Sequence, residues 1–346
     1  MSIKGSLDTN KNSEILMLNA LGILLVVVGH SQGVLPSLQH TLASENILYA
    51  TFLALIDVIY TFHMPLFFFI SGYLFFYTGA GDKDSFFSFL IKKSNRLLLP
   101  YFIISSLTYP LKVILSNFAL RPVEFGWIDY ASTLIIPWNN SIVFFWFLPT
   151  LYLIMMIAKL CLCHGDSLKR DVFIMISAVF LFFYFDHKNI AGWQSVLNIG
   201  GVLHNFIYFV TGGFLFKYVH IFAFKRRALY LIAPFLILLI FYIYYPGIRK
   251  VELFEVAMSF SGILFCFSVI KHLPLSFSVL GKYSYQIYLL SWFPQIFVRV
   301  VFGQVFFVNI WISVFLSILA GLVLPIVASN IIERINNKWL SKAFGL

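Results

Sequence analysis

The chain has 346 residues, of which 60% are hydrophobic and only 11% charged, and its mean hydropathy is +0.90. Soluble domains carry about 25% charged residues, so this composition excludes a water-soluble globular protein. The net charge of +10 comes from basic residues scattered along the chain, which argues against a nucleic-acid-binding protein. The composition predicts an all-α polytopic membrane protein that contacts membrane lipids.

Apolar runs of about 20 residues, the length that crosses a bilayer as a helix, can be placed ten times along the chain. The first run has no cleavage-site pattern behind it, so we expect a retained helix rather than a signal peptide. No stretch between the runs is long enough for a second domain, so one integral-membrane domain is expected over residues 1–346. The runs lie near 14–35, 50–77, 97–117, 143–163, 171–187, 196–217, 227–246, 252–271, 281–303 and 306–332.

The basic residues predict how these ten spans are oriented. An even number of spans places both termini on one side of the membrane. With the N-terminus in the cytoplasm, 18 of the 24 Lys and Arg residues fall on the inner side. This positive-inside asymmetry predicts that both termini are cytoplasmic. The six outer residues are Lys112, Arg121, Lys188, Arg249, Lys250 and Arg299.

The first span contains a histidine in the stretch "GILLVVVGHSQGVLP", Gly22 to Pro36. His30 lies about 24 Å above the start of this span, in the outer half of the membrane. Gly22, Gly29 and Gly33 fall on one helical face, where small residues let a neighbouring helix approach closely. An ionisable group inside a membrane is a candidate functional group, although a histidine satisfied by one hydrogen bond can also be structural.

The second span contains a histidine followed by a proline, in "TFHMPLFFFISGYLFF" from Thr61 to Phe76. Pro65 is expected to interrupt the helix, and interrupted helices in membranes line protein or a water-filled cavity. His30, Asp57 and His63 are therefore expected in one region as candidates for direct chemistry. In the alternative structural interpretation, Asp57 pairs with a tyrosine and His63 caps the broken turn.

A basic stretch precedes the third span, in "FLIKKSNRLLLPYFI" from Phe89 to Ile103. Lys92, Lys93 and Arg96 are three or four residues apart and can lie along one helical flank. Positive-inside anchoring alone would place lysines here. The alternative is a phosphate clamp, because the guanidinium of Arg96 suits bidentate phosphate contact.

The three cysteines, Cys161, Cys163 and Cys266, form no disulfide framework. The stretch "CLCHG" brings His164 beside two of them, but a metal site usually needs a fourth ligand. We therefore expect no metal site and interpret this stretch as the edge of a loop.

Together these stretches resemble the integral-membrane acyltransferase 3 family. The likeness is greatest to its O-acetyltransferase branch for sugars and surface polysaccharides, such as fucose 4-O-acetylase-like proteins. The motifs occur in order over most of the chain. They are "ILLVVVGH" ending at His30, "FHMPLFFFISGYLF" from Phe62 to Phe75, "KKSNRLLLPY" from Lys92 to Tyr101, "WFLPTLY" from Trp146 to Tyr152 and a weaker fifth, "LGKYSYQIYLLSW" from Leu280 to Trp292.

This resemblance implies about ten helices in the inner membrane of a bacterium. It also implies transfer of an acetyl group from cytoplasmic acetyl-CoA to a hydroxyl of a carbohydrate, at the cell surface or still lipid-linked. The activated thioester donor needs no tightly bound cofactor. By resemblance, His30 is the essential catalytic residue, and Lys93 and Arg96, with Lys92 beside them, belong to the acyl-CoA site.

The chain departs from the family pattern at two positions. Asn19 stands where the family commonly has a cation eleven residues before the histidine, and it can offer the donor only a neutral hydrogen bond. Ser291 stands where many relatives show a histidine. Candidates for oxyanion donors are the polar residues near the span ends, Ser31, Gln32 and Asn205.

Three other classes of protein are compatible with parts of the sequence. A transporter or lipid-linked-sugar flippase would share the helix number and broken segments, but no two-fold hydropathy repeat is visible. A polysaccharide polymerase is expected to have a large basic outer loop, whereas residues 118–142 contain only Arg121 as a basic residue. A structural or sensory protein has little reason to place histidines and a basic triad on adjoining helices.

Overall fold

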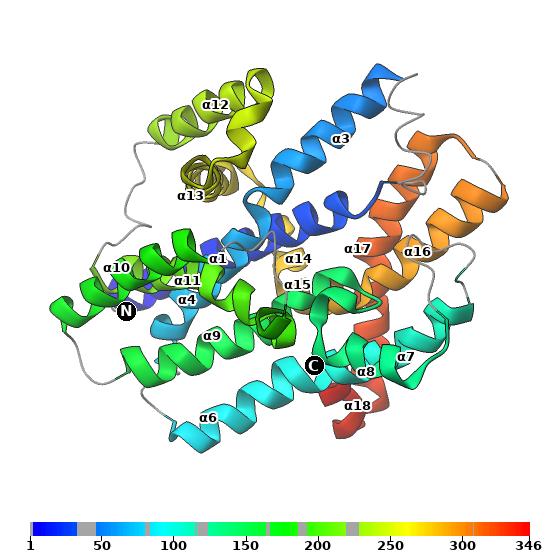
Figure 1. The fold of residues 1–346 in the computed structure, drawn as a ribbon, viewed down its shortest axis with the longest axis horizontal. Coiled ribbons are helices and arrows are strands. Elements are labelled where there is room, and N and C mark those ends of the chain that lie inside the picture. The colour runs from blue at the N-terminus through cyan, green and yellow to red at the C-terminus, as the bar shows by residue number, and fades with distance from the viewer. Residues whose placement is uncertain are drawn as a thin grey trace. The chain divides into compact units, whose positions relative to one another are not determined.

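The computed structural model describes residues 3–32, 46–79, 84–114, 116, 124–163, 167–185, 192–218, 228–306 and 308–346. Every regular element within these ranges is a helix, which confirms the all-α class (Figure 1). The chain forms two compact units. Unit 1 comprises Met1–Ile70 and His220–Ala328, and unit 2 comprises Ser71–Val219 and Ser329–Leu346. The single domain expected over residues 1–346 stays a prediction.

Unit 1 contains the N-terminal helices and most of the C-terminal third of the chain. Two helices extend from it into unit 2, α4 (His63–Tyr77) and α17 (Ile310–Ile335). Its other elements are α1 (Ile3–Gly29), α3 (Ile47–Tyr60), α12 (Ala228–Tyr244), η7 (Pro246–Lys250), α13 (Glu252–Val269), η8 (Ile270–His272), η9 (Leu275–Phe277), α14 (Ser278–Lys282), α15 (Ser284–Leu290), α16 (Trp292–Val300) and η10 (Val301–Val305).

Unit 2 contains the middle of the chain and its C-terminal end. Within it, α10 (Leu168–Tyr184) packs along α11 (Ile199–Tyr218), as Figure 1 shows. Its other elements are α6 (Phe86–Lys93), η1 (Ser94–Leu98), α7 (Leu99–Ile114), α8 (Trp127–Ile135), η3 (Pro137–Asn139), η4 (Val143–Trp146), α9 (Phe147–Leu162), η5 (Gly192–Asn198) and α18 (Lys338–Ala343).

The glycine face predicted on α1 is a packing surface. A Cβ added at Gly22 would lie 2.9 Å from the ring of Phe67, and one added at Gly29 would lie 2.9 Å from the ring of Tyr60. Two aromatic side chains from α3 and α4 therefore rest on the backbone of α1, as expected for small residues at helix contacts. Gly33, the third member of the predicted face, lies outside the described residues.

The segment from α14 to α16 runs beside α1 in the same direction. Near its start, a Cβ at Gly281 would collide with the backbone carbonyl of Leu16. Further along, the amide Nε2 of Gln295 donates a hydrogen bond of 2.8 Å to the carbonyl of Val27. Residue numbers rise along both segments from the first contact to the second, so α1 and the segment from α14 to α16 run parallel.

Replacing Gly281 by alanine is expected to destabilise the protein by about 1–3 kcal/mol, because the added methyl group meets backbone that cannot rotate away. Thermal unfolding of the detergent-purified protein measures the effect. Gly247→Ala is the matched control, since nothing lies within 4 Å of a Cβ at Gly247. Equal stability of the two variants would contradict the close contact between α14 and α1.

The predicted count of about ten spanning helices is not confirmed. Within the described ranges, six helices are long and apolar enough to cross a membrane. They agree with six of the ten expected spans. These six are Ile47–Tyr77, Phe86–Ile114, Val143–Leu162, Gly192–Tyr218, Glu252–His272 and Ile310–Ile335.

The other four expected spans are shorter or broken helices. The described apolar parts of α1 and α12 are Ser13–Gly29 and Ile232–Tyr244. Helix α10 has 17 residues, with Lys169, Arg170 and Asp171 near its start. The run near 281–303 is divided among α14, α15, α16 and η10. A hydropathy average over a window does not register such breaks, so these four spans stay predictions.

Candidate active site

His30 lies at the C-terminal end of α1. Its backbone N–H still donates to the carbonyl of Val26 at 3.1 Å, and the next residue, Ser31, closes a tighter turn onto Val28. The imidazole is half-buried, whereas Ser31 is fully buried. A histidine at a helix end therefore keeps part of its ring accessible, as a group that meets a substrate requires.

Tyr60, at the end of α3, connects the two predicted histidines. Its ring centroid lies 5.9 Å from that of His30 and 5.2 Å from that of His63. Its hydroxyl donates a hydrogen bond of 2.6 Å to the carbonyl of Gly29, the residue before His30. The structure thus brings His30 and His63 into one region of unit 1, as predicted, and both rings lie within 6 Å of the ring of Tyr60.

His63 begins α4 directly after a break in the second span. Helix α3 ends at Tyr60, and α4 starts two residues before Pro65, at a position where a missing N–H costs no helical hydrogen bond. The Nδ1 of His63 lies 2.9 Å from the carbonyl of Ile59. Since a carbonyl only accepts, Nδ1 carries the proton and Nε2 of the neutral ring has the lone pair. His63 is 5% exposed, so it supports the site from inside the protein.

Asp57 lies one helical turn before Tyr60 on α3, and its side chain is exposed. It interacts electrostatically with Arg249 and with Tyr60. Arg249 in turn lies over the ring of Tyr242, 4.2 Å from the ring centroid, and its Nε donates to the Tyr242 carbonyl at 3.0 Å. Asp57 therefore belongs to a charged edge of the same region, beside the histidines rather than between them.

Replacing Tyr60 by phenylalanine is expected to cost about 1 kcal/mol of stability, because the Gly29 carbonyl loses its donor. Since Tyr60 positions the end of α1, we also expect kcat to fall several-fold while KM for the donor is unchanged. Steady-state kinetics and thermal unfolding test this. Tyr244→Phe is the matched control, because Tyr244 is 74% exposed. A kcat equal to that of the control would contradict a positioning role.

In unit 2, the basic stretch lies where the helix widens. α6 ends at Lys93 and continues as the π-helical turn η1, in which the N–H of Leu99 bonds to the carbonyl of Ser94. Pro100 has no N–H for the carbonyl of Arg96, four residues earlier, so a regular helix cannot continue there. Such π-turns occur often at functional sites.

A fourth basic residue joins the predicted triad. Lys92 forms an ion pair of 2.6 Å with Asp84, and Lys159 from α9 donates to the backbone carbonyl of Asp84 at 2.8 Å. Lys93 lies 5.3 Å, and Lys159 6.0 Å, from the ring centroid of the buried Phe89. We name this group the basic cluster: Lys92, Lys93, Arg96 and Lys159.

The basic cluster carries more positive than negative charge. Lys93 interacts electrostatically with both Arg96 and Asp84. Asp84 brings a carboxylate to the cluster, paired with Lys92 and within electrostatic reach of Lys93. Lys92 is 61% exposed and Arg96 is exposed too, so a soluble anion can reach them. This arrangement suits the phosphates of a nucleotide-like ligand.

The "WFLPTLY" motif is joined to the basic stretch within unit 2. The hydroxyl of Ser94 donates to the hydroxyl of Tyr152 at 3.1 Å, which ties η1 to α9. At the start of the motif, Trp146 stacks on Trp138 with ring centroids 5.2 Å apart. The "WFLPTLY" motif therefore supports the π-turn that carries Arg96.

The remaining polar candidates have structural hydrogen bonds or no site contact. The Ser31 hydroxyl donates to the Val28 carbonyl at 2.7 Å, and the Gln32 carbonyl accepts from Tyr49 at 2.8 Å. Asn205, in unit 2, donates to Gly201 at 2.8 Å. Asn19, in the middle of α1, is half-buried and about 16 Å from His30 by helical rise.

His164, the histidine of the "CLCHG" stretch, lies outside the described residues. In the part of the chain that the structure describes, no three His, Cys, Asp or Glu side chains gather as metal ligands would. Cys161 is exposed and Cys163 is half-buried at the end of α9, and neither is disulfide-bonded. The described residues thus offer no donor set for a metal.

Sequence reasoning missed two residues of these sites. Tyr60 is one of 18 tyrosines and carries no distinguishing pattern, apart from lying three residues after Asp57 and three before His63. Lys159 was predicted only as an inner basic residue, because its contact with Asp84 joins positions 75 apart in sequence. Only tertiary structure brings such residues to a site.

The fold and the sites define a helical membrane protein with a half-buried histidine at a helix end in unit 1 and a basic cluster in unit 2. A family model described as an acyltransferase domain, that of the acyltransferase 3 family, matches residues 14–330. The chain therefore belongs to this family of membrane acyltransferases. No curated protein and no solved structure matches the chain.

Proposed function

We propose that this membrane acyltransferase moves an acetyl group from cytoplasmic acetyl-CoA to a hydroxyl of a carbohydrate. The acceptor is a cell-surface glycan or its lipid-linked precursor, as in the fucose 4-O-acetylase-like branch that the motifs resemble. The protein acts in the inner membrane of a bacterium with both termini in the cytoplasm, in keeping with 18 of its 24 basic residues on that side.

One observation carries this proposal: within the family's acyltransferase domain, the half-buried His30 lies at the end of helix α1, beside the ring of Tyr60. Tyr60 holds the adjacent backbone through the hydrogen bond to Gly29, and the ring of His63 lies 5.2 Å from that of Tyr60. These contacts fix the end of α1 that carries the proposed catalytic imidazole.

In the proposed reaction, His30 takes the proton of the sugar hydroxyl while the oxygen attacks the thioester carbonyl carbon. A new C–O bond forms, the C–S bond of acetyl-CoA breaks, and His30 returns the proton to the leaving sulfur of CoA. The products are an acetyl ester and free CoA. General-base catalysis of this kind increases the rate by about 10²–10⁴-fold. Holding the donor and the acceptor next to each other increases the rate further.

In a second version of the same reaction, His30 carries the acetyl group on its ring nitrogen before the sugar takes it. The two versions differ in what happens without an acceptor. Only an acetyl-enzyme exchanges labelled CoA into acetyl-CoA when no sugar is present. Exchange that is lost in His30→Ala would establish the covalent route, and its absence from active wild-type enzyme would establish direct transfer.

The donor is assigned to the basic cluster, because its surplus positive charge suits the phosphates of acetyl-CoA. Arg96 offers a planar fork for bidentate phosphate contact, and Lys93 and Lys92 add point charges beside it. Asn19 offers a neutral hydrogen bond along the donor's path. None of the described contacts favours a flippase or transporter.

The proposal is tested by mass spectrometry of surface glycans from cells with and without the gene. We expect the mass increment of an added acetyl group only when the gene is present, and its loss in His30→Ala cells that express the protein equally. In parallel, purified protein in lipid vesicles should release CoA from acetyl-CoA when acceptor glycan is added. Identical glycans in both strains and no CoA release would overturn the proposed function.

A further inference from the structure

A stripe of polar side chains from the junction of α15 and α16 along α16 contains buried polar atoms that lack hydrogen-bond partners among the described residues. Ser291, Gln295 and Arg299 are spaced four residues apart and so share one helical face. Ser291 is 1% and Gln295 5% exposed, and Arg299 is half-buried. Within the described residues, the Ser291 hydroxyl, Gln295 Oε1 and Arg299 Nε are buried and have no hydrogen-bond partner. Buried polar atoms are rarely left unpaired, so this face is suited to a ligand.

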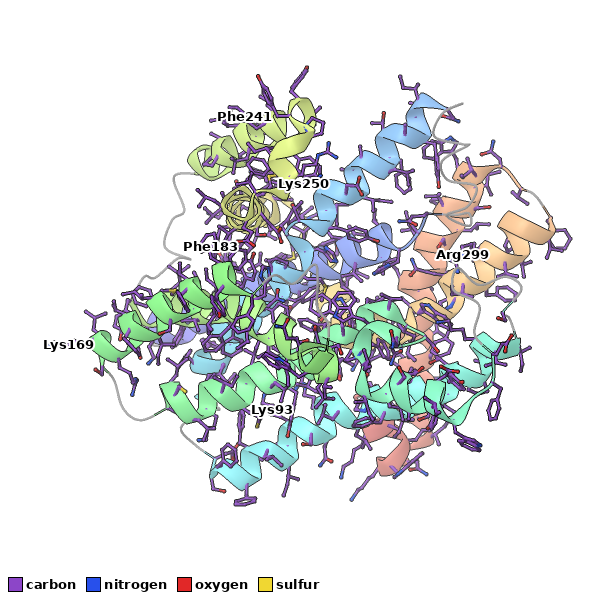
Figure 2. All side chains as sticks on the ribbon, in the orientation of Figure 1. Lys93, Lys169, Phe183, Phe241, Lys250 and Arg299 are labelled. Atoms are coloured by element: carbon purple, nitrogen blue, oxygen red, sulfur yellow. The ribbon has the colours of Figure 1, made fainter. Side chains whose placement is uncertain are left out.

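The stripe lies level with His30 in unit 1. Gln295 Nε2 donates a hydrogen bond of 2.8 Å to the Val27 carbonyl, and the segments that carry these two residues run in the same direction. His30 follows Val27 by three residues, and Arg299 follows Gln295 by four, so each lies about one turn beyond this contact. Figure 2 labels Arg299 on α16. The stripe therefore borders the region where the acyl group would be transferred.

The charge of Arg299 indicates the kind of ligand. A guanidinium stays protonated in proteins, and burying it without a counter-charge is unfavourable. No ion pair to Arg299 occurs among the described residues, and α15 and α16 contain no Asp or Glu. With no counter-charge among the described residues, a bound anion would supply one, and the planar guanidinium of arginine matches a carboxylate or a phosphate.

We propose that Arg299 and Gln295 bind an anionic group of the acceptor beside His30. Arg299 pairs with the carboxylate or phosphate, while Gln295 Oε1 accepts a hydrogen bond from a sugar hydroxyl and Ser291 offers its own hydroxyl. The acceptor is then an acidic saccharide or a sugar still attached to its lipid through phosphate. This inference rests on the proposed function for its link to catalysis, but the anion site itself can be measured independently.

The binding test uses the purified full-length protein and thermal unfolding. The probes are methyl β-glucuronide for a carboxylate, farnesyl phosphate for a lipid-linked phosphate, and methyl β-glucoside as the neutral analogue. We expect at least one anionic probe to bind the wild type more tightly than the glucoside. We expect Arg299→Gln to weaken that binding by about 10- to 100-fold, the loss typical of a charged hydrogen-bonded pair.

Two control variants separate anion binding from general damage. Lys250→Gln removes an exposed cation at the end of η7, and this variant should bind the anions as the wild type does. Arg299→Lys keeps the positive charge but lacks the planar guanidinium that can donate two hydrogen bonds to one anion. This variant should therefore bind the anionic probes more tightly than Arg299→Gln and less tightly than the wild type. If neither anion binds better than the glucoside, or if Arg299→Gln binds them like wild type, the proposed site is wrong.

The same variants tested for acetyl transfer distinguish failure of this site from failure of the proposed function. With an anionic acceptor, Arg299→Gln should lower kcat/KM by about tenfold or more, and with a neutral one it should have little effect. Anion binding that depends on Arg299 without transfer to any carbohydrate would refute the proposed function alone. Transfer that depends on His30, with anion binding unaffected in Arg299→Gln, would refute the anion site alone.

Discussion

Replacing His30 by alanine is expected to reduce acetyl transfer by about 10²–10⁴-fold, the usual contribution of a general base. The substitution removes the imidazole of the half-buried His30 at the end of α1, whereas the Tyr60 hydroxyl still donates its hydrogen bond to the adjacent Gly29 carbonyl. Because the backbone contact is retained, the variant should fold and insert normally. The measurement is CoA release and acetyl incorporation in vesicles with matched protein amounts.

His272→Ala is the matched control for this experiment. His272 is an exposed histidine of unit 1, in η8, so its replacement tests the loss of an imidazole from the surface of the same unit. We expect its activity to stay close to that of the wild type. Retention of wild-type activity by His30→Ala, or an equal loss in both variants, would defeat the assignment of His30 as the reactive residue.

The double replacement of Lys93 and Arg96 by alanine is expected to raise KM for acetyl-CoA by about 10²-fold. Each charged hydrogen bond to a phosphate contributes about 1.5–3 kcal/mol, and the double variant removes the two cations that the π-turn and Phe89 hold in place. With saturating donor, kcat should fall much less, since the lost contacts act in the ground state and transition state alike. Steady-state kinetics over a range of acetyl-CoA concentrations measures both constants.

Two further variants define how specific this effect is. Lys169→Ala removes an exposed cation at the start of α10 and should leave KM unchanged. Lys92→Ala should raise KM less than the double variant, because Lys92 is already paired with Asp84. If Lys169→Ala raised KM as much as the double variant, the donor would be attracted by diffuse charge rather than by the basic cluster.

The sequence placed His30 and His63 in one region because the signals there are local, while their catalytic role stays a prediction. A histidine in an apolar run stands out in any sequence, and Pro65 correctly indicated that the second span is broken near His63. The glycine spacing on α1 also predicted a close helix contact, which Phe67 and Tyr60 make at Gly22 and Gly29. These features depend on residues within a few turns of one another.

Other parts of the sites depend on contacts that sequence spacing does not reveal. The hydrogen bond from Gln295 to Val27 joins positions 268 residues apart, and that of Tyr60 to Gly29 joins positions 31 apart. The breaks at Tyr283 and Ser291 likewise divide an apolar run that hydropathy treats as one helix. For this reason the sequence did not reveal these breaks and left Tyr60, Lys159 and the contact of Gln295 undetected.

By itself, then, the sequence determined the class of this protein: its apolar runs require helices in a membrane, because every backbone polar group must be satisfied within the segment. It also determined which ionisable residues are candidates for function, because placing a charged group in hydrocarbon is energetically costly and such residues are therefore rare in membrane helices. The tertiary structure alone decided which of these residues meet, because helices of similar composition pack through close contacts at a few small residues. Those contacts place Tyr60 against His30, Lys159 beside Asp84 and Gln295 on the backbone of α1.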